Sequence, residues 1–307
     1  MWAGTKLRDV LGKPDSGPFI GESWEISGVA GDVSVVANGP LTGKKLDELI
    51  QLGPDRLLGA SVHARFGKEF PILVKYIDAK LDLSVQVHPG DALARSRHNS
   101  FGKTEMWYIM DADTDGRLII GFNREVSRAE YEKSLETNTL LDLLNVVPVK
   151  EGDTFFINNG RIHAIGAGIL LAEIQQTSDI TYRVYDFDRR DQHGKKRELH
   201  TQQALDAIDY SNVDDYSVAY QKMPNVLNPM VHSPYFKTDY LELDHDFSMD
   251  VSNRDSFTIF LCVAGTAQIA NEAGGVAIRR GETVLVSADT QNIGIETKGA
   301  KFLEVTL

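Results

Sequence analysis

The chain has 307 residues, which is enough for two domains of ordinary size. Its hydrophobic content of 42% and charged content of 25% are typical of a globular protein. The formal net charge of −12 disfavours nucleic acid as a partner, because binding to a phosphate backbone needs a basic surface. The same charge means that an anionic ligand must be held by a local cluster of basic side chains.

The only cysteine is Cys262, which excludes an intrachain disulfide and a metal site built from cysteines. The sequence has no apolar run of 18 residues and does not open with a signal peptide. We therefore expect a cytoplasmic protein that does not bind membranes.

Strands dominate the pattern of the first two thirds of the chain. Alternating or apolar runs predict strands at 21–27, 33–37, 70–77, 83–88, 103–110, 117–122, 169–175 and 180–187. Helical spacing is seen from Leu46 to Leu58, with an interruption at Gly53-Pro54. A capping box at Ser127 opens a small helical insert at about 125–145, whose leucines are expected to serve packing.

The segment 83–89 alternates strictly between apolar and polar residues. Its apolar side chains point one way, whereas Ser84, Gln86 and His88 point the other. A polar row must face solvent or a polar cavity, because a buried and unpaired polar group costs roughly 1–3 kcal/mol. Gln86 and His88 are about 6–7 Å apart along the strand, so both can converge on one cation.

Two later segments offer matching side chains. Lys103 and Glu105 share one face of a second predicted strand, which follows a loop that contains Gly and Asn. A turn, a short apolar strand and a tight Asn-Gly turn lead to His163. Together with Gln86 and His88, these residues would present one amide oxygen, two imidazoles and one carboxylate. That donor set suits Zn²⁺ or another borderline divalent cation, with a position left for water or substrate.

The spacing around these residues resembles the cupin motifs. Gly152, Gly160 and His163 fit the pattern G-x5-P-x-G-x2-H, with Asn158 in the place of the proline. The earlier segment resembles the H-x-H…E half of the cupin pattern, with Gln86 at the first histidine. A lone histidine on a strand is more often structural than a ligand, so the combination is what indicates a metal site.

Arg183 falls within a strand that is rich in aromatic residues. A buried arginine is costly unless it meets an anion. Its partner is therefore either a carboxylate such as Glu173 or Asp179, or a bound anion. A basic run at 189–197 follows, and a run of this kind is usually a solvated loop.

A second region begins after the polar, turn-rich segment Ser211 to Pro234, where we place a domain boundary. Short strands separated by glycines follow, which is typical of a small β-barrel. His232 and His245 lie outside the predicted strands, so this barrel is expected to be structural. We predict a mainly β fold with two cupin-like, jelly-roll barrels. The first is a catalytic domain at 1–220 with the helical insert, and the second is a non-catalytic domain at 221–307.

With these segments in place, the sequence resembles the type I phosphomannose isomerases, in their short bacterial or archaeal form, over nearly the whole chain. The most specific parts of the resemblance are 21–27, 83–89, 103–107, 160–163 and 173–183. The resemblance implies a zinc-dependent cupin enzyme that interconverts mannose 6-phosphate and fructose 6-phosphate. The N-terminus differs, since Ala3 replaces the first Gly of the family's Trp-Gly-Gly-Thr element. We expect the strand that usually precedes this element to be either missing or supplied in another way.

The resemblance also implies roles for individual residues. The ligands of one Zn²⁺ per chain fall on His88, Glu105 and His163, with Gln86 as a further ligand that short forms can lack. The catalytic arginine of the family falls on Arg183.

Three other residues are candidates because of the faces they share. Lys103 is a candidate for moving protons or contacting a substrate oxygen, and Ser84 for a hydrogen bond to the substrate. Glu173 is a weaker candidate for contacting the substrate or acting as the base. The expected reaction moves a proton between C2 and C1 through an enediol. The basic run at 189–197 could meet the substrate phosphate.

Two alternatives belong to other functional classes. One is a metal-dependent cupin of another kind, such as a dioxygenase; Gln86 and Lys103 argue against it, because iron sites favour histidine-rich sets. The other is a non-catalytic cupin that binds a sugar phosphate, against which the full ligand set with Arg183 argues. The expected partner is a small sugar phosphate, and the protein is expected to be a monomer or a homodimer. The sequence leaves the native metal and the proton-transfer base open.

Overall fold

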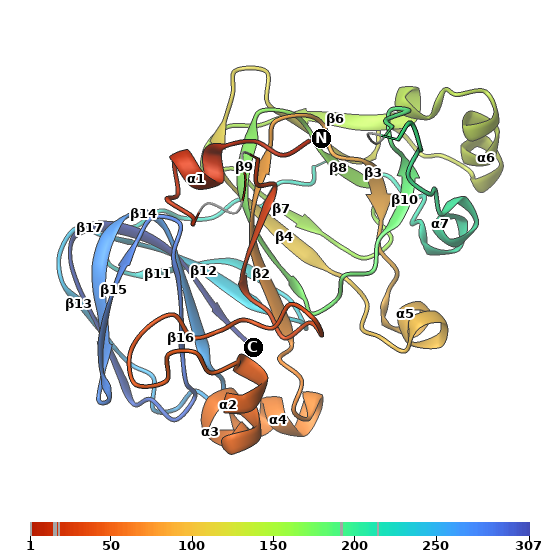
Figure 1. Cartoon of the computed structure of the whole chain (residues 1–307). Helices are drawn as coiled ribbons and strands as arrows, with labels where there is room; N and C mark the ends of the chain where they lie inside the picture. Colours follow the sequence, from red (N-terminus) through yellow and green to blue (C-terminus); the bar gives the residue numbers. More distant parts are fainter. Residues whose placement is uncertain (1, 15–16, 18, 191–192, 214) are drawn as a thin grey trace. The chain divides into compact units, whose positions relative to one another are not determined.

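The protein is described by a computed structural model that covers residues 2–14, 17, 19–190, 193–213 and 215–307 (Figure 1). It forms two compact units, each with its own internal contacts. The first consists mainly of Tyr76–Ser217, and the second of Trp24–Lys75 together with Val218–Leu307. The predicted division at residue 220 stays a prediction, because compactness does not test independent folding. No helix in the described ranges is long and apolar enough to cross a membrane.

Two five-stranded sheets carry the candidate site residues. The first sheet has the order β1 (Glu22–Ile26), β2 (Ile72–Ala79), β9 (Ile169–Gln176), β4 (Glu105–Ala112) and β7 (Thr154–Ile157). The second has the order β10 (Tyr182–Tyr185), β3 (Val85–Val87), β8 (His163–Ile165), β5 (Arg117–Phe122) and β6 (Leu144–Pro148). Trp107 and Ile109 of β4 pack in one core with Leu118 and Ile120 of β5, so the two sheets face each other.

Short helices join these strands. They are α1 (Lys6–Asp9), α5 (Asp91–His98), α6 (Arg128–Glu136), the 3₁₀ helix η1 (Leu140–Leu143) and α7 (Thr201–Ala207). Helices α6 and η1 confirm the predicted insert: the Ser127 hydroxyl caps α6 by accepting from the backbone N–H of Glu130. Leu140 and Leu143 are buried, which fits a packing role.

Helix α5 occupies the segment between His88 and Lys103 that the sequence suggested was a loop. Its start is fixed by Asp91, whose Oδ1 accepts from Gly102 N at 2.8 Å and from Gln176 Nε2 at 3.0 Å. The two ends of the segment that contains α5 therefore lie close together. The helix lacks an apolar stripe, and this is why its spacing gave no signal.

The second unit contains a seven-stranded sheet and three helices. The main strand order is β11 (Leu227–His232), β12 (Lys237–Leu243), β17 (Asn292–Thr306), β14 (Thr258–Asn271) and β15 (Gly274–Arg279). In addition, β13 (Phe247–Asp250) pairs with β17 and β16 (Thr283–Val286) pairs with β14. The helices are α2 (Leu46–Leu52), α3 (Pro54–Leu58) and α4 (Ala60–Phe66), and the predicted break at Gly53-Pro54 is confirmed.

The prediction of a mainly β fold is confirmed, but the sheets do not close into the two predicted barrels. In the described residues the hydrogen-bonded order of each sheet is open, with β1, β7, β10 and β6 as edges of the two five-stranded sheets. Facing open sheets can bury the same apolar surface as a barrel, so alternation along a strand does not distinguish the two.

Strand β11 lies inside the segment that was predicted to be a polar boundary. It contains Pro229, which a central strand would not tolerate, but β11 is an edge strand and its pairing shifts register between Pro229 and Val231. His232, expected outside the strands, ends β11. The expectation that this whole segment is turn-rich was therefore wrong for β11, whereas the domain boundary placed in the segment stays a prediction.

Gly160 fixes the turn between β7 and β8. Its φ is +79°, and a Cβ at this position would lie 2.8 Å from the carbonyl oxygen of Ala207. Gly194 has a similar φ of +77°, but a Cβ there would meet no atom within 4 Å. A side chain at Gly194 would therefore cause backbone strain alone, whereas a side chain at Gly160 would cause backbone strain and a steric overlap.

We predict that Gly160→Ala lowers the free energy of unfolding by about 2–3 kcal/mol, because strain and overlap add. Gly194→Ala should cost about 1 kcal/mol, since only the left-handed backbone is penalised. Urea unfolding of both variants measures the difference. Equal losses would show that the contact with Ala207 does not constrain the turn.

Candidate active site

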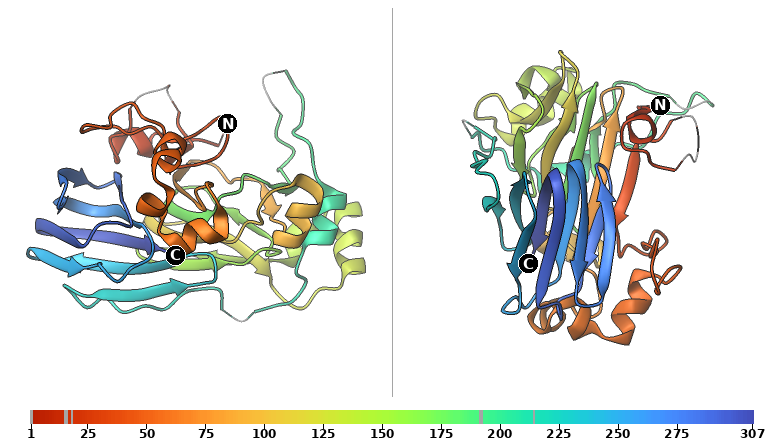
Figure 2. Two further views of the ribbon diagram at one scale, coloured as in Figure 1. Left: turned by 90° about the horizontal axis from the view of Figure 1, so that it is seen from below. Right: turned by 90° about the vertical axis from the view of Figure 1, so that its left-hand side faces the viewer.

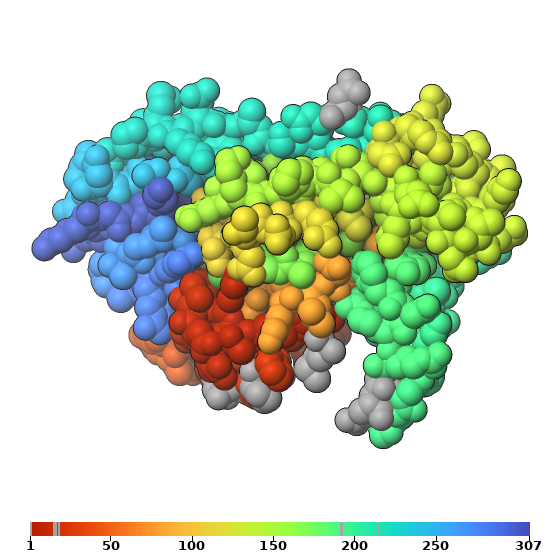
Figure 3. Space-filling view, turned by 90° about the horizontal axis from the view of Figure 1, so that it is seen from above, coloured from red at the N-terminus to blue at the C-terminus, as the bar shows by residue number. Residues whose placement is uncertain are grey.

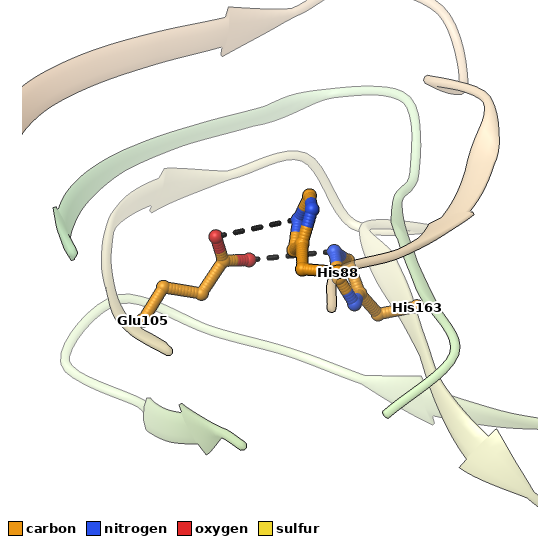
Figure 4. A group of neighbouring side chains, drawn as sticks. All are labelled: His88, Glu105 and His163. Atoms are coloured by element: carbon orange, nitrogen blue, oxygen red, sulfur yellow. Dashed lines mark ion pairs between the residues drawn. The ribbon is translucent and has the colours of Figure 1, made fainter. Parts of the chain in front are cut away.

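Three side chains that could hold a metal ion meet in the first unit. The candidate ligand atoms of His88, Glu105 and His163 all lie within 4.8 Å of one another, and all three residues are buried. His88 Nε2 is 3.6 Å from Glu105 Oε2, and His163 Nε2 is 3.4 Å from Glu105 Oε1. Figure 4 shows the carboxylate facing both imidazoles. The structure thus brings together the three residues that the sequence singled out from distant segments.

These three residues come from both facing sheets. His88 directly follows β3 and precedes Pro89, and His163 opens β8, which pairs with β3 through Gln86 opposite His163. Glu105 opens β4 in the other sheet. The cluster therefore lies between the two sheets, and its geometry depends on how they pack.

The tautomers of both histidines are fixed by backbone carbonyls. His88 Nδ1 is 2.9 Å from the Ile180 carbonyl oxygen, and His163 Nδ1 is 2.8 Å from that of Arg161. A carbonyl can only accept, so each Nδ1 carries the proton and each Nε2 keeps its lone pair for a metal. Burial lowers the pKa of His163 to about 4, so this imidazole is neutral at pH 7, as a ligand must be.

The residues present fit a divalent cation. Two neutral imidazole nitrogens and one carboxylate converge, and Glu105 Oε1 accepts no hydrogen bond from the described residues. A fully buried carboxylate is unfavourable without nearby positive charge. Lys103 supplies one charge at Oε2, and a cation would supply another at Oε1. The mixed nitrogen and oxygen set is of the kind that zinc accepts.

Gln86 lies directly beside this cluster. Its Nε2 is 3.3 Å from His163 Nε2, so the amide donates to the imidazole lone pair. Ser84 is also buried, just before β3, but among the described residues it makes no hydrogen bond or ion pair with the cluster.

Lys103 is buried between two carboxylates. Its Nζ is 2.9 Å from Glu105 Oε2 and 3.9 Å from Glu173 Oε1. Burial by itself would lower the pKa of Lys103, but the charges of Glu105 and Glu173 outweigh it and raise the pKa above the ordinary value. Trp107 Nε1 donates to Glu173 Oε2 at 2.9 Å and so orients this carboxylate.

Arg183 lies on the face of its sheet that carries the metal cluster. In the register of β10, β3 and β8, Arg183 is opposite Gln86, and Gln86 is opposite His163. Residues in such a row point to the same face, and two strand spacings place Arg183 about 10 Å from His163. Its Nη1 donates to the Glu198 carbonyl oxygen at 2.9 Å. The partner in the described residues is thus a backbone carbonyl and not the carboxylate of Glu173 or Asp179.

Further basic residues surround Arg183. They lie on the long segment between β10 and α7, which extends away from the sheets (Figures 2 and 3). Arg189 and Arg197 both contact Asp186 Oδ1 at 2.5 Å. Burial and the nearby guanidinium of Arg197 lower the pKa of Arg183. Two guanidinium groups, those of Arg189 and Arg197, therefore share the Asp186 carboxylate next to Arg183.

Sequence reasoning missed two residues of this region. Trp107 alternates with Glu105 on β4, which is the signal that could have placed both on the inner face. Asp186 gave no signal, because its role depends on the fold of the segment that follows β10.

Comparisons with known proteins identify relatives of this chain. The model of the type I phosphomannose isomerase catalytic domain matches residues 2–119, and the model of the mannose-6-phosphate isomerase cupin domain matches residues 227–303. A probable mannose-6-phosphate isomerase of Bacillus subtilis is 39% identical over 84% of this chain and 78% of its own length. A mannose-6-phosphate isomerase of Streptococcus mutans is 34% identical over 93% of this chain and 88% of its own.

A solved structure covers the whole chain. The crystal structure of a mannose 6-phosphate isomerase from Bacillus subtilis matches 100% of this chain and 95% of its own, with a TM-score of 0.88 and 32% identity. A structure from Archaeoglobus fulgidus, at 23% identity and a TM-score of 0.75, shares the fold. Both parts of the chain are matched by models of one family, and relatives above 30% identity span most of its length. The chain therefore belongs to the type I phosphomannose isomerases, a family of aldose–ketose isomerases.

Proposed function

We propose that this protein is a zinc-dependent isomerase that interconverts mannose 6-phosphate and fructose 6-phosphate through an enediol. The observation that carries the proposal is the buried cluster of His88, Glu105 and His163, with both imidazoles presenting Nε2, in a chain of this family. The relatives named above are mannose-6-phosphate isomerases, which supports the choice of substrate.

The reaction moves one proton between two adjacent carbons. A base removes the proton from C2 of the aldose and returns it to C1, while a second proton passes from the C2 hydroxyl to the C1 oxygen. The barrier lies in removing a carbon-bound proton and in stabilising the oxyanion that develops. When bound, the divalent cation supplies Lewis acidity to these oxygens. His88, Glu105 and His163 would hold one Zn²⁺ per chain. Gln86 would add its amide oxygen after a flip of its side-chain amide, because its nitrogen now donates to His163 Nε2.

Lys103, Glu173 and Ser84 are the groups proposed to act on the sugar. Lys103 holds a proton 2.9 Å from Glu105, and we assign it the protonation of a substrate oxygen. Glu173 is the candidate base or substrate contact, since Trp107 fixes one of its oxygens while Lys103 lies 3.9 Å from the other. Ser84 would donate to a sugar hydroxyl.

Arg183 and the basic segment after it are proposed to orient the anionic substrate. The row of Arg183, Gln86 and His163 separates the backbone of Arg183 from that of His163 by about 10 Å, so a sugar phosphate lying along it would have its phosphate near the guanidinium and its reacting carbons near the cation. A protein with a net charge of −12 needs such a local basic cluster to attract an anion. Arg189 and Arg197 beside Asp186 would meet the phosphate.

The second unit is proposed to be non-catalytic. Two of its histidines are engaged with carboxylates: His232 Nε2 is 2.7 Å from Asp239 Oδ1, and His245 Nδ1 is 2.5 Å from Asp244 Oδ1. We also propose that residues 1–220 and 221–307 are two cupin-like domains of the jelly-roll type. A cytoplasmic location and a monomeric or homodimeric state stay predictions.

His163→Ala should reduce bound zinc well below one per chain and lower kcat/KM by more than ~100-fold, because one ligand nitrogen is lost. Chelation of the unmodified protein should abolish activity, and zinc should restore it. Metal analysis and a coupled assay with mannose 6-phosphate measure both effects. The matched control is His245→Ala, which removes an exposed imidazole. Unchanged zinc content and turnover in His163→Ala would contradict the ligand assignment.

Arg183→Ala should lower kcat by roughly 10²–10³-fold and change KM much less, because the guanidinium would act mainly on the developing oxyanion or on substrate orientation. Steady-state kinetics with mannose 6-phosphate separates the two parameters. A rise in KM alone would restrict Arg183 to anchoring the phosphate.

Arg197→Ala should raise KM for mannose 6-phosphate about 10-fold with little change in kcat, because one charged hydrogen-bond donor to the phosphate is removed. Arg190→Ala is the control on the same segment, since Arg190 donates to the Gly194 carbonyl oxygen and is exposed. Equal effects of the two substitutions would place the phosphate elsewhere.

A further inference from the structure

Gln175 is a buried amide next to the metal cluster that the mechanism above does not use. In the pairing of β4 with β9, Gln175 is opposite Glu105, and Glu173 is opposite Trp107. Residues opposite each other in an antiparallel pair share a face, with Cβ atoms about 4.5–5.5 Å apart. Gln175 therefore lies on the inner face of the first sheet, beside a proposed metal ligand, and is fully buried.

The orientation of this amide is fixed by two backbone carbonyls. Its Nε2 donates to the carbonyl oxygen of Gln176 at 2.8 Å and to that of Ser178 at 2.6 Å. Because both partners can only accept, the nitrogen must face them and Oε1 must face away. Within the part of the chain that the structure describes, Oε1 is buried and receives no hydrogen bond.

A buried acceptor without a donor is unfavourable, and native proteins rarely keep one without a reason. The two bonds of Nε2 account for the amide nitrogen, but they leave the cost of the buried oxygen uncompensated. The polar oxygen is therefore explained best by a donor that arrives with a ligand. It lies on the face shared by Glu105 and Glu173, where the proposed substrate is a chain of hydroxyl groups.

We propose that Gln175 Oε1 accepts a hydrogen bond from a hydroxyl of the bound sugar phosphate, on one of the carbons C3 to C5 between the reacting carbons and the phosphate. Gln175 is then a specificity-determining residue, which selects a hydroxylated chain. The inference rests on the proposed function, because that function makes a sugar phosphate the occupant of this site.

The two bonds of Nε2 also have a structural consequence that the experiment must separate. They hold the segment after β9, in which the Ile180 carbonyl accepts from His88 Nδ1. Substitution of Gln175 could thus disturb a metal ligand. Zinc content distinguishes this effect from loss of a substrate contact, and discrimination between substrates is a readout that a purely structural role would not change.

The experiment compares kcat/KM for mannose 6-phosphate with that for its 3-deoxy, 4-deoxy and 5-deoxy analogues. The unmodified protein should use one analogue roughly 10- to 100-fold less well, because that analogue leaves Oε1 without a donor. In Gln175→Met, this penalty should fall to within about 3-fold, while the zinc content stays unchanged. The control Gln202→Met replaces an exposed glutamine of α7 and should keep the full penalty.

Two results would overturn the inference: equal use of all three analogues by the unmodified protein, or the same penalty in Gln175→Met as in the unmodified protein. The first needs no variant, so it applies even if Gln175→Met does not fold; Gln175→Leu then takes its place in the second. Absence of any turnover of mannose 6-phosphate by the zinc-loaded, unmodified protein would instead reject the proposed function. The two failures are therefore distinguishable.

Discussion

The carboxylate of Glu105 is buried completely between two sheets, and the other site residues are arranged around its negative charge. An ionised group in such a place is stable only with positive charge and hydrogen-bond donors close by. Lys103 provides one charge at 2.9 Å. The two imidazoles present lone pairs, not protons, so a cation is the partner that suits both them and the remaining carboxylate oxygen.

This arrangement depends on the register of the strands as much as on the residues. Slipping β3 by one residue against β8 would turn Gln86 and the residues that alternate with it to the opposite face. The same register brings Arg183 into line with Gln86 and His163. One pairing therefore sets the positions of a basic residue, an amide and an imidazole together, and backbone carbonyls then fix the orientation of the imidazole ring.

Much of the site could be predicted from local patterns. Alternation along 83–89 identified Gln86 and His88, and the glycine spacing before His163 identified a tight turn. The alternating pattern of a strand does not show which distant strand it pairs with. The contact of Lys103 with Glu173 and the burial of Gln175 were therefore not predictable. Barrel closure was wrong for the same reason, because a strand pattern records which face is buried and not where a sheet ends.

The segment between His88 and Lys103, which contains α5, can vary in sequence and length without disturbing the site. Asp91 binds both the far end of the segment, at Gly102, and the neighbouring strand end, at Gln176, while Lys103 N donates to the Pro89 carbonyl oxygen at 3.1 Å. These hydrogen bonds hold the two ends of the segment next to each other. The segment between these bonds can be lengthened, shortened or exchanged without moving His88 or Glu105, so its sequence can diverge while the cluster of His88, Glu105 and His163 stays in place.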